Sequence, residues 1–191
     1  MSERITSPVQ LRESMVAHLL FADPRASIIW LIVRIWVGYQ WLESGWGKIT
    51  NPAGVWVGAK AGVAISGFVQ GAIEKAFGEH PAVQQWYADF LTTAVLPNAS
   101  LFGYLVAFGE VAVGLGLILG LLTGIAAFFG VVMNTNFLLA GTVSINPMLL
   151  IPSIFLMLAW RNAGWLGLDR FALPLVGTPW QSGAVFDHPK T

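Results

Sequence analysis

Residues 90–160 read FLTTAVLPNASLFGYLVAFGEVAVGLGLILGLLTGIAAFFGVVMNTNFLLAGTVSINPMLLIPSIFLMLAW and hold one charged side chain, Glu110. A helix needs roughly 20 apolar residues to cross a hydrocarbon core about 30 Å thick. The stretch predicts three membrane spans, at about residues 100–121, 124–141 and 147–161, and the apolar segment 27–47 predicts another. We therefore expect an all-α integral membrane protein built as a four-transmembrane-helix bundle.

The composition of the chain agrees with a membrane protein. Of its 191 residues 55% are hydrophobic and only 10% are charged, whereas a soluble domain carries about 25% charged residues. The formal net charge is zero, so charge balance predicts neither a nucleic-acid partner nor an acidic substrate. The length suits a single domain, residues 1–191.

The chain has few residues that bind metals or react as nucleophiles. It contains no cysteine, and its histidines, His18, His80 and His188, all lie outside the apolar spans. Disulfides, iron–sulfur clusters and thiolate chemistry are therefore excluded, and the bundle interior lacks imidazole ligands for haem or a metal. We expect no bound metal and no covalently held cofactor, so an electron carrier would be diffusible, such as quinone, or would belong to a partner.

Amphipathic segments precede the first span and separate it from the second. Ser7-Pro8 is typical of a helix start, and apolar residues follow at helical spacing, which predicts an interfacial helix near the N-terminus. The connection at residues 55–96 holds two more amphipathic patterns, separated by His80-Pro81 and ended by Pro97-Asn98. We expect two helices lying across the mouth of the bundle as a lid, and interfacial helices without a gating role remain the alternative.

The distribution of basic residues predicts the orientation. Four spans place both termini on one side of the membrane, and the basic residues of that side are Arg4, Arg12, Arg25, Arg161, Arg170 and Lys190. The long connection holds only Lys48, Lys60 and Lys75. Because cytoplasmic loops are enriched in Lys and Arg, we expect a multi-pass plasma-membrane protein with both termini in the cytoplasm and the lid outside.

Polar side chains at membrane depth form the candidate site. Arg34, Glu110 and Asn134 fall on three different predicted spans, and Asn136 lies on another face of the third. Ionisable groups in lipid face the bundle interior and have partners, so we expect Arg34 and Glu110 to pair. One interpretation is a buried ion pair that fixes helix register. The other is a polar pocket for a quinone head, an anion or a proton.

Aromatic and charged residues around this constellation complete the candidate pocket. Its predicted walls are the aromatic residues Trp30, Trp36, Tyr39 and Trp41. Lys48 reads first as an interfacial anchor and second as a ligand for an anion. Asp169 and Arg170 are adjacent in the sequence, and we interpret them as a local ion pair. The candidate catalytic residues are therefore Arg34, Glu110 and Asn134, and the candidate pocket adds Trp41, Lys48 and Asn136.

Four segments of the chain resemble the DoxX/DoxD family of small four-helix membrane proteins. They are RIWVGYQWLESGWGKI (34–49), GEVAVGLGLILGLLTG (109–124), NTNFLLAGTVSINP (134–147) and WRNAGWLGLDRF (160–171). The long lid resembles the DoxD-like branch. That branch is similar to the large subunit of a thiosulfate:quinone oxidoreductase, which passes two electrons from thiosulfate to membrane quinone beside a small DoxA-type subunit.

The resemblance implies a quinone-interacting membrane redox subunit. Arg34 or Lys48 would attract an anionic donor, while Glu110 and Asn134 would hold or protonate a quinone oxygen. Two other functions remain open: a non-catalytic accessory subunit of a larger respiratory or redox complex, and a carrier for a small hydrophobic solute or lipid. The expected partners are membrane lipid, quinone and a DoxA-type subunit or larger complex, with no nucleic acid.

Overall fold

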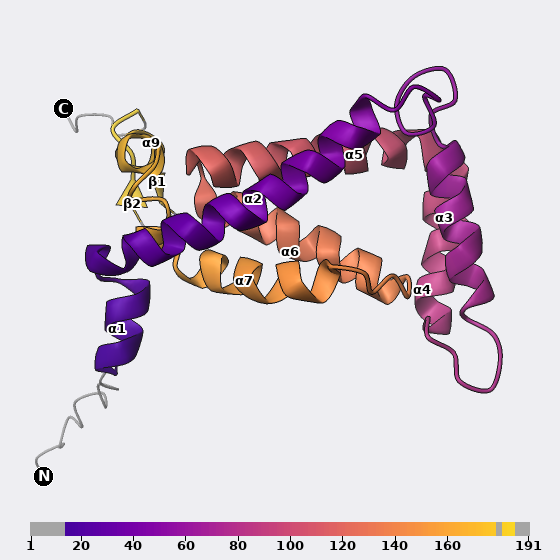
Figure 1. The fold of residues 1–191 in the computed structure, drawn as a ribbon, viewed down its shortest axis with the longest axis horizontal. Coiled ribbons are helices and arrows are strands. Elements are labelled where there is room, and N and C mark those ends of the chain that lie inside the picture. Colours follow the sequence, from indigo (N-terminus) through magenta and orange to yellow (C-terminus); the bar gives the residue numbers. More distant parts are fainter. Residues whose placement is uncertain (1–13, 179–180, 186–191) are drawn as a thin grey trace, which may run out of the picture.

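The computed structural model describes residues 14–178 and 181–185, and these residues are mostly helical (Figure 1). The helices are α1 (Met15–Phe21), α2 (Ser27–Ile49), α3 (Val63–Glu74), α4 (Gln85–Phe90), α5 (Ala99–Leu119), α6 (Thr123–Leu139), α7 (Asn146–Leu158), α8 (Trp160–Ala163) and α9 (Asp169–Val176). A short antiparallel pair, β1 (Gly177–Thr178) and β2 (Gln181–Ser182), follows α9.

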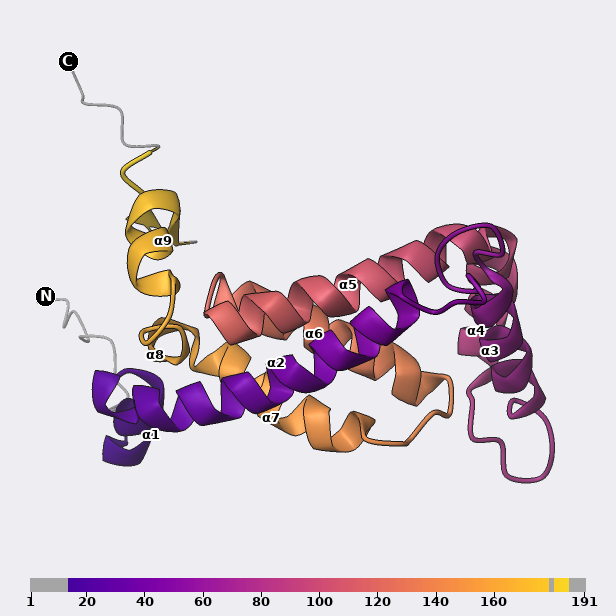
Figure 2. The same ribbon diagram turned by 45° about the horizontal axis from the view of Figure 1, so that its top comes forward.

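Four helices, α2, α5, α6 and α7, run along the long axis of the molecule (Figure 1). Helices α3 and α4 stand across one end, which we name the lid end. Helices α1 and α9 lie at the opposite end, which we name the terminal end, and Figure 2 shows the same separation. The two ends of the described chain therefore lie at the same end of the molecule.

Glycines set the closest helix contact in the bundle, between α2 and α5. A Cβ atom on Gly114 of α5 would lie 2.6 Å from the backbone nitrogen of Leu42, and one on Gly45 of α2 would lie 2.7 Å from that of Val111. No side chain fits at either position, so the two backbones are in contact. Small residues are the usual means by which helices approach closely within a membrane.

The four long-axis helices occupy the positions predicted for the four spans, but they differ in length. The continuous helix from Gln85 to Leu119 is long and apolar enough to cross a membrane, and α1 with α2 forms a second candidate that is bent by 59°. Helix α6 has 17 residues and α7 has 13, or about 26 and 20 Å at 1.5 Å per residue. The chain is thus a membrane-type helical protein, and the number of crossings stays a prediction.

The expected end of the second lid helix at Pro97-Asn98 is wrong. Helical structure continues from α4 through a π-helical turn (Leu91–Val95) and a 3-10 turn (Leu96–Asn98) into α5. The chain changes direction in these turns (Figure 1). Pro97 stands in the first turn of the new helix direction, where its missing N–H is not needed, so it redirects the helix without ending it.

The N-terminal amphipathic helix is seen in part, because Ser7-Pro8 lies outside the described residues. Helix α1 begins after Ser14, whose Oγ accepts a hydrogen bond from Ala17 N at 3.1 Å. Its other end is fixed to the bundle, since Trp30 Nε1 donates to Leu20 O at 2.7 Å and Asn162 Nδ2 donates to the same oxygen at 2.9 Å. These bonds hold α1 against the terminal end.

Candidate functional site

The buried carboxylate Glu110 is paired with Lys48 and not with Arg34. Lys48 Nζ lies 2.5 Å from Glu110 Oε2 and also donates to Ser44 Oγ at 2.7 Å. The side chain of Glu110 is 2% exposed, and that of Lys48 is 17% exposed. The pair therefore links a group in the bundle interior to one that reaches the surface at the lid end.

Local helix structure places these groups together. Ser44 and Lys48 stand one turn apart on α2, so they face the same way. Gly45 lies between them and packs against α5, where a Cβ on it would come within 2.8 Å of Glu110 Cβ. The missing side chain thus lets the last turns of α2 close on Glu110.

Trp56, which the sequence analysis did not single out, covers the charged pair. Lys48 Nζ lies 5.0 Å from the centre of its ring, a cation–π arrangement. Trp56 belongs to the loop between α2 and α3, and a Cβ on Gly103 of α5 would lie 2.6 Å from its carbonyl oxygen. Gly103 therefore allows the loop to lie directly on α5.

An apolar groove of about 870 Å³ begins at Trp56 and runs between α5 and α6. At the lid end its lining includes Tyr87, and at the terminal end it includes Leu121 and Leu122 in the turn between the two helices. Leu119, Ile125 and Phe129 at its edge are 47%, 54% and 53% exposed. The groove is therefore open along its side to the outside of the helix bundle.

Asn136 and Tyr87 close the lid end of this groove. The Tyr87 hydroxyl lies 3.0 Å from both the backbone oxygen and Oδ1 of Asn136. Asn136 Nδ2 donates to Val132 O at 2.8 Å. Asn136 is thus a groove residue whose amide already has partners on α4 and α6, and it stands apart from the bundle interior.

The predicted Arg34–Glu110 pair is wrong because the two groups lie at different depths. Gly45 marks the level of Glu110 on α2, and Arg34 is about 16 Å away along that helix at 1.5 Å per residue. Arg34 is 1% exposed and its Nη2 donates to Leu166 O at 2.9 Å. A Cβ on Gly120 would overlap its Nη1, so the glycine backbone encloses the guanidinium at the terminal end.

The predicted ion pair between Asp169 and Arg170 is also wrong. Asp169 is 3% exposed, and its two carboxylate oxygens accept from Leu122 N at 2.5 Å and Thr123 N at 2.9 Å. Free N–H groups at a helix start favour a carboxylate there, and Asp169 binds those at the start of α6. The guanidinium of Arg170 instead lies 5.6 Å from the centre of the Trp165 ring.

Asn134 and Trp41 are buried, as the candidate pocket requires, but they make no hydrogen bond to Glu110. Asn134 is 0% exposed, and both of its amide atoms and Trp41 Nε1 have no hydrogen-bond partner among the described residues. A Cβ on Gly109 would lie 3.4 Å from Met133 Sδ, which places Asn134 near the level of Glu110. They are polar groups in the bundle interior with unused hydrogen-bonding capacity.

Two members of the predicted aromatic wall are buried and two are not. Trp30 and Trp41 are 6% and 2% exposed, whereas Trp36 and Tyr39 are 41% and 54% exposed and face outward. Sequence reasoning missed Ser44, Trp56 and Tyr87. Of these, only Ser44 could have been predicted from the sequence, because it lies one helical turn before Lys48.

The residues described at 14–178 and 181–185 contain no group of three or more His, Cys, Asp or Glu side chains able to hold a metal ion. Comparison with protein families gives a match to the DoxX model over residues 29–142. No curated protein and no solved structure matched. The matched region covers more than half of the chain, including nearly all of α2, the lid and both sides of the groove, and the chain therefore belongs to the DoxX family of membrane proteins.

Proposed function

We propose that this chain is a quinone-interacting subunit of a membrane redox system of the thiosulfate:quinone oxidoreductase type. The observation that supports the proposal is Trp56, whose ring lies over Lys48 of the Lys48–Glu110 pair and which also lines the end of the apolar groove. A quinone combines a polar ring with a long apolar tail, so its binding site needs polar groups for the ring and an apolar groove for the tail. Apolar pockets with a few placed polar groups are typical of such ligands.

The charged pair suits the ring of a quinone. A quinone that accepts two electrons also takes up two protons to become a quinol. The Lys48 ammonium would donate a hydrogen bond to a ring carbonyl and stabilise negative charge as it develops on that oxygen. Glu110 would keep the ammonium in place and exchange a proton with it, and the partly exposed Lys48 would exchange protons with the lid end.

The groove suits the tail. It follows α5 from Phe102 to Leu119, or about 25 Å at 1.5 Å per residue, and its lining is largely apolar. Because its edge residues are exposed, a tail would enter sideways from the bilayer without passing through the bundle.

The electron donor and the partner follow from the resemblance to the DoxD-like branch. Thiosulfate would meet the protein at the lid end, outside the membrane if both termini are cytoplasmic, and a DoxA-type subunit would bind there. Electrons would then reach a ring held below Trp56.

A photoreactive azidoquinone tests the binding step. We expect purified chain in phosphatidylcholine nanodiscs to be labelled on α5, α6 and the segment around Trp56, and unlabelled quinone to compete. Lys48→Met should weaken quinone binding by roughly 10- to 100-fold, since a hydrogen bond to a charged group contributes roughly 1.5–3 kcal/mol. Lys60→Met, which removes an exposed lysine of the same connection, should bind as the wild type does. Labelling outside the groove, or equal binding by both variants, would overturn the proposal.

A second measurement tests the donor. Membranes that contain the chain and a DoxA-type subunit should reduce a quinone analogue when thiosulfate is added. No rate above that of empty membranes would reject thiosulfate as donor. Quinone binding without turnover would then favour the accessory-subunit role.

A further inference from the structure

A continuous stripe of exposed residues runs along the outward face of α2. Its members recur every three or four residues, the spacing that keeps side chains on one face of a helix. We name it the α2 stripe, and it consists of Ile29, Ile32, Trp36, Tyr39, Glu43 and Trp46. The five uncharged members are between 41% and 68% exposed. Neither the Lys48–Glu110 pair nor the groove between α5 and α6 uses any of these residues.

The stripe carries one charge, the carboxylate of Glu43. Glu43 is exposed, and within the part of the chain that the structure describes it forms no hydrogen bond and no ion pair. Its neighbours one turn away on α2, none of them basic, are Tyr39, Gln40, Trp46 and Gly47. The described chain therefore supplies no counter-charge for this carboxylate.

The contact between α2 and α5 places Glu43 near the middle of the bundle. A Cβ on Gly45 would lie 2.7 Å from the backbone nitrogen of Val111, and α5 begins at Ala99, about 18 Å from Val111 toward the lid end at 1.5 Å per residue. Toward the terminal end α2 extends about 24 Å from Glu43 to Ser27. A hydrocarbon core about 30 Å thick fits between these limits only with Glu43 inside it.

The direction of α2 keeps the carboxylate away from water. Side chains on a helix lean toward its N-terminus, and α2 begins at the terminal end (Figure 1). Glu43 stands in the second half of the helix, so its side chain leans toward the middle of the span and not toward the nearer lid end. Charged groups at such depth are costly unless they have partners. We therefore expect the partner to come from another molecule.

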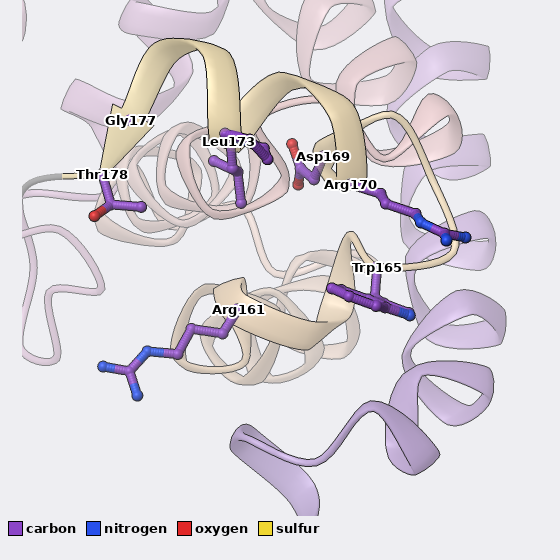
Figure 3. A pocket seen from close by; sticks show the side chains of 8 residues that line it. Arg161, Trp165, Asp169, Arg170, Leu173, Gly177 and Thr178 are labelled. Atoms are coloured by element: carbon purple, nitrogen blue, oxygen red, sulfur yellow. The ribbon is translucent and has the colours of Figure 1, made fainter. Parts of the chain in front are cut away.

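A second copy of this chain would not supply the counter-charge. Helices α5, α6 and α7 contain no Lys or Arg. In α2 itself Arg34 is 1% exposed, and Lys48 forms the ion pair described above. Figure 3 shows Arg161 and Arg170 on the segments of α8 and α9, beyond the membrane-spanning part of α2. Residues of a symmetric membrane dimer meet at equal depth, so Glu43 would meet no cation there.

We propose that the α2 stripe docks a transmembrane helix of another protein, and that this helix carries a Lys or Arg side chain level with Glu43. The cation would pair with the carboxylate close to the rings of Tyr39 and Trp46, one turn to either side, where cation–π contacts add to the attraction. A Cβ on Gly47 would have nothing within 4 Å, so a partner backbone has room to approach. One polar residue on an otherwise apolar seam also fixes the register of paired helices.

Association with two synthetic helices tests the proposal. The probes are Leu/Ala transmembrane peptides with either Arg or Leu at the centre, a position that has the same depth in both orientations. Energy transfer in phosphatidylcholine vesicles, from a donor on the N-terminus of the full chain, measures binding. We expect the wild type to bind the Arg peptide about 5- to 30-fold more tightly than the Leu peptide, the range of one polar contact between membrane helices.

Glu43→Gln should lose this preference for the Arg peptide. Glu74→Gln, at an exposed acid that ends α3, should keep it. Equal binding of the two peptides by the wild type, or a preference that persists in Glu43→Gln, would overturn the proposal. A wild-type dimer that Glu43→Gln dissociates would assign the stripe to a second copy and would overturn it as well.

Two measurements on the chain alone test the position and the role of the carboxylate. Because the sequence has no cysteine, Glu43→Cys carries a single thiol, which a water-soluble maleimide should modify much more slowly than the thiol of Lys60→Cys. Equal rates would place position 43 in water. The Tm of Glu43→Gln should be no lower than that of the wild type, and a lower Tm would mean a partner within the chain. Either result would overturn the proposal, and neither depends on quinone binding.

Discussion

Asp169 binds the start of α6 from a position far along the chain, with its Oδ2 atom 2.9 Å from Thr123 N. The same carboxylate accepts from Leu122 N, and the neighbouring turn supplies the Leu166 carbonyl that binds Arg34. Three segments that are remote in sequence, the middle of α2, the α5–α6 turn and the entry to α9, are therefore joined at one point. This joint fixes the terminal end of the bundle.

Replacing Asp169 by Asn should destabilise the protein although the side chain keeps its shape. The amide retains one acceptor oxygen but loses its charge, and a hydrogen bond to a charged group contributes about 1.5–3 kcal/mol. We expect a loss of about that size in the free energy of unfolding, measured by denaturation in detergent micelles. Asp89→Asn, at an exposed acid of α4, should change it by less than about 0.5 kcal/mol. Equal effects of the two variants would contradict the role of Asp169.

Lys48 and Glu110 should respond asymmetrically to removal of their partner. Lys48→Met leaves a carboxylate that is 2% exposed without a counter-charge, which costs about 3–5 kcal/mol. Glu110→Gln leaves Lys48, which is 17% exposed and can turn toward water, so its effect should be smaller.

The double variant Lys48→Met/Glu110→Gln should recover most of the stability that Lys48→Met loses, because neither of these two positions then carries a charge. A double-mutant cycle from thermal unfolding measures this coupling. If Glu110→Gln is the more harmful single change, the carboxylate is needed for a reason other than this pair.

The sequence was a good guide to helix positions and a poor guide to polar partners. A run of apolar residues is continuous in the sequence and can be recognised without knowing the fold. Helices α2, α5, α6 and α7 therefore lie where the apolar runs predict them. The partner of Glu110 depends on which residue of α2 lies level with it on α5. The hydropathy of the two helices does not determine where along α2 the backbone of α5 makes contact. Gly45 determines that level, and it favours Lys48.

The two other errors have similar causes. Asp169 is next to Arg170 in the sequence, but the free N–H groups of a turn 46 residues away attract its carboxylate. Pro97 is a strong stop signal in isolation, yet a proline at the start of a new helix direction costs little. In each case a contact or a chain direction set elsewhere in the fold outweighs the local pattern.

The α2–α5 contact should tolerate no added methyl group at its centre. A Cβ on Gly114 would meet the backbone of Leu42 at 2.6 Å, and a backbone cannot move aside as a flexible side chain does. Gly114→Ala should therefore cost about 1–3 kcal/mol of stability through overpacking. Gly47→Ala, at a glycine of α2 with nothing within 4 Å, should stabilise by up to about 1 kcal/mol through helix propensity. Thermal unfolding of the Gly114→Ala and Gly47→Ala variants measures both effects. If Gly114→Ala did not lower the Tm, α2 and α5 would have to be farther apart than they are in this structure.

Substitution of Asn134 tests whether the polar residue in the bundle interior is there for stability or for function. Its amide is 0% exposed and lacks hydrogen-bond partners among the described residues, an arrangement that costs about 1–3 kcal/mol. Asn134→Leu should therefore leave stability unchanged or raise it by about 1 kcal/mol. Asn136→Leu should lower it, because the Tyr87 hydroxyl loses one of its two acceptors.

Azidoquinone labelling of the same two variants decides why Asn134 is polar. Proteins retain a destabilising polar group where function requires it, so we expect the more stable Asn134→Leu variant to bind quinone more weakly than the wild type. A variant that is more stable and binds equally well would exclude Asn134 from the site and leave the ring to Lys48, Glu110 and Trp56. Lower stability in Asn134→Leu would mean instead that the amide has a partner, most simply a buried water bridging it to Trp41 Nε1.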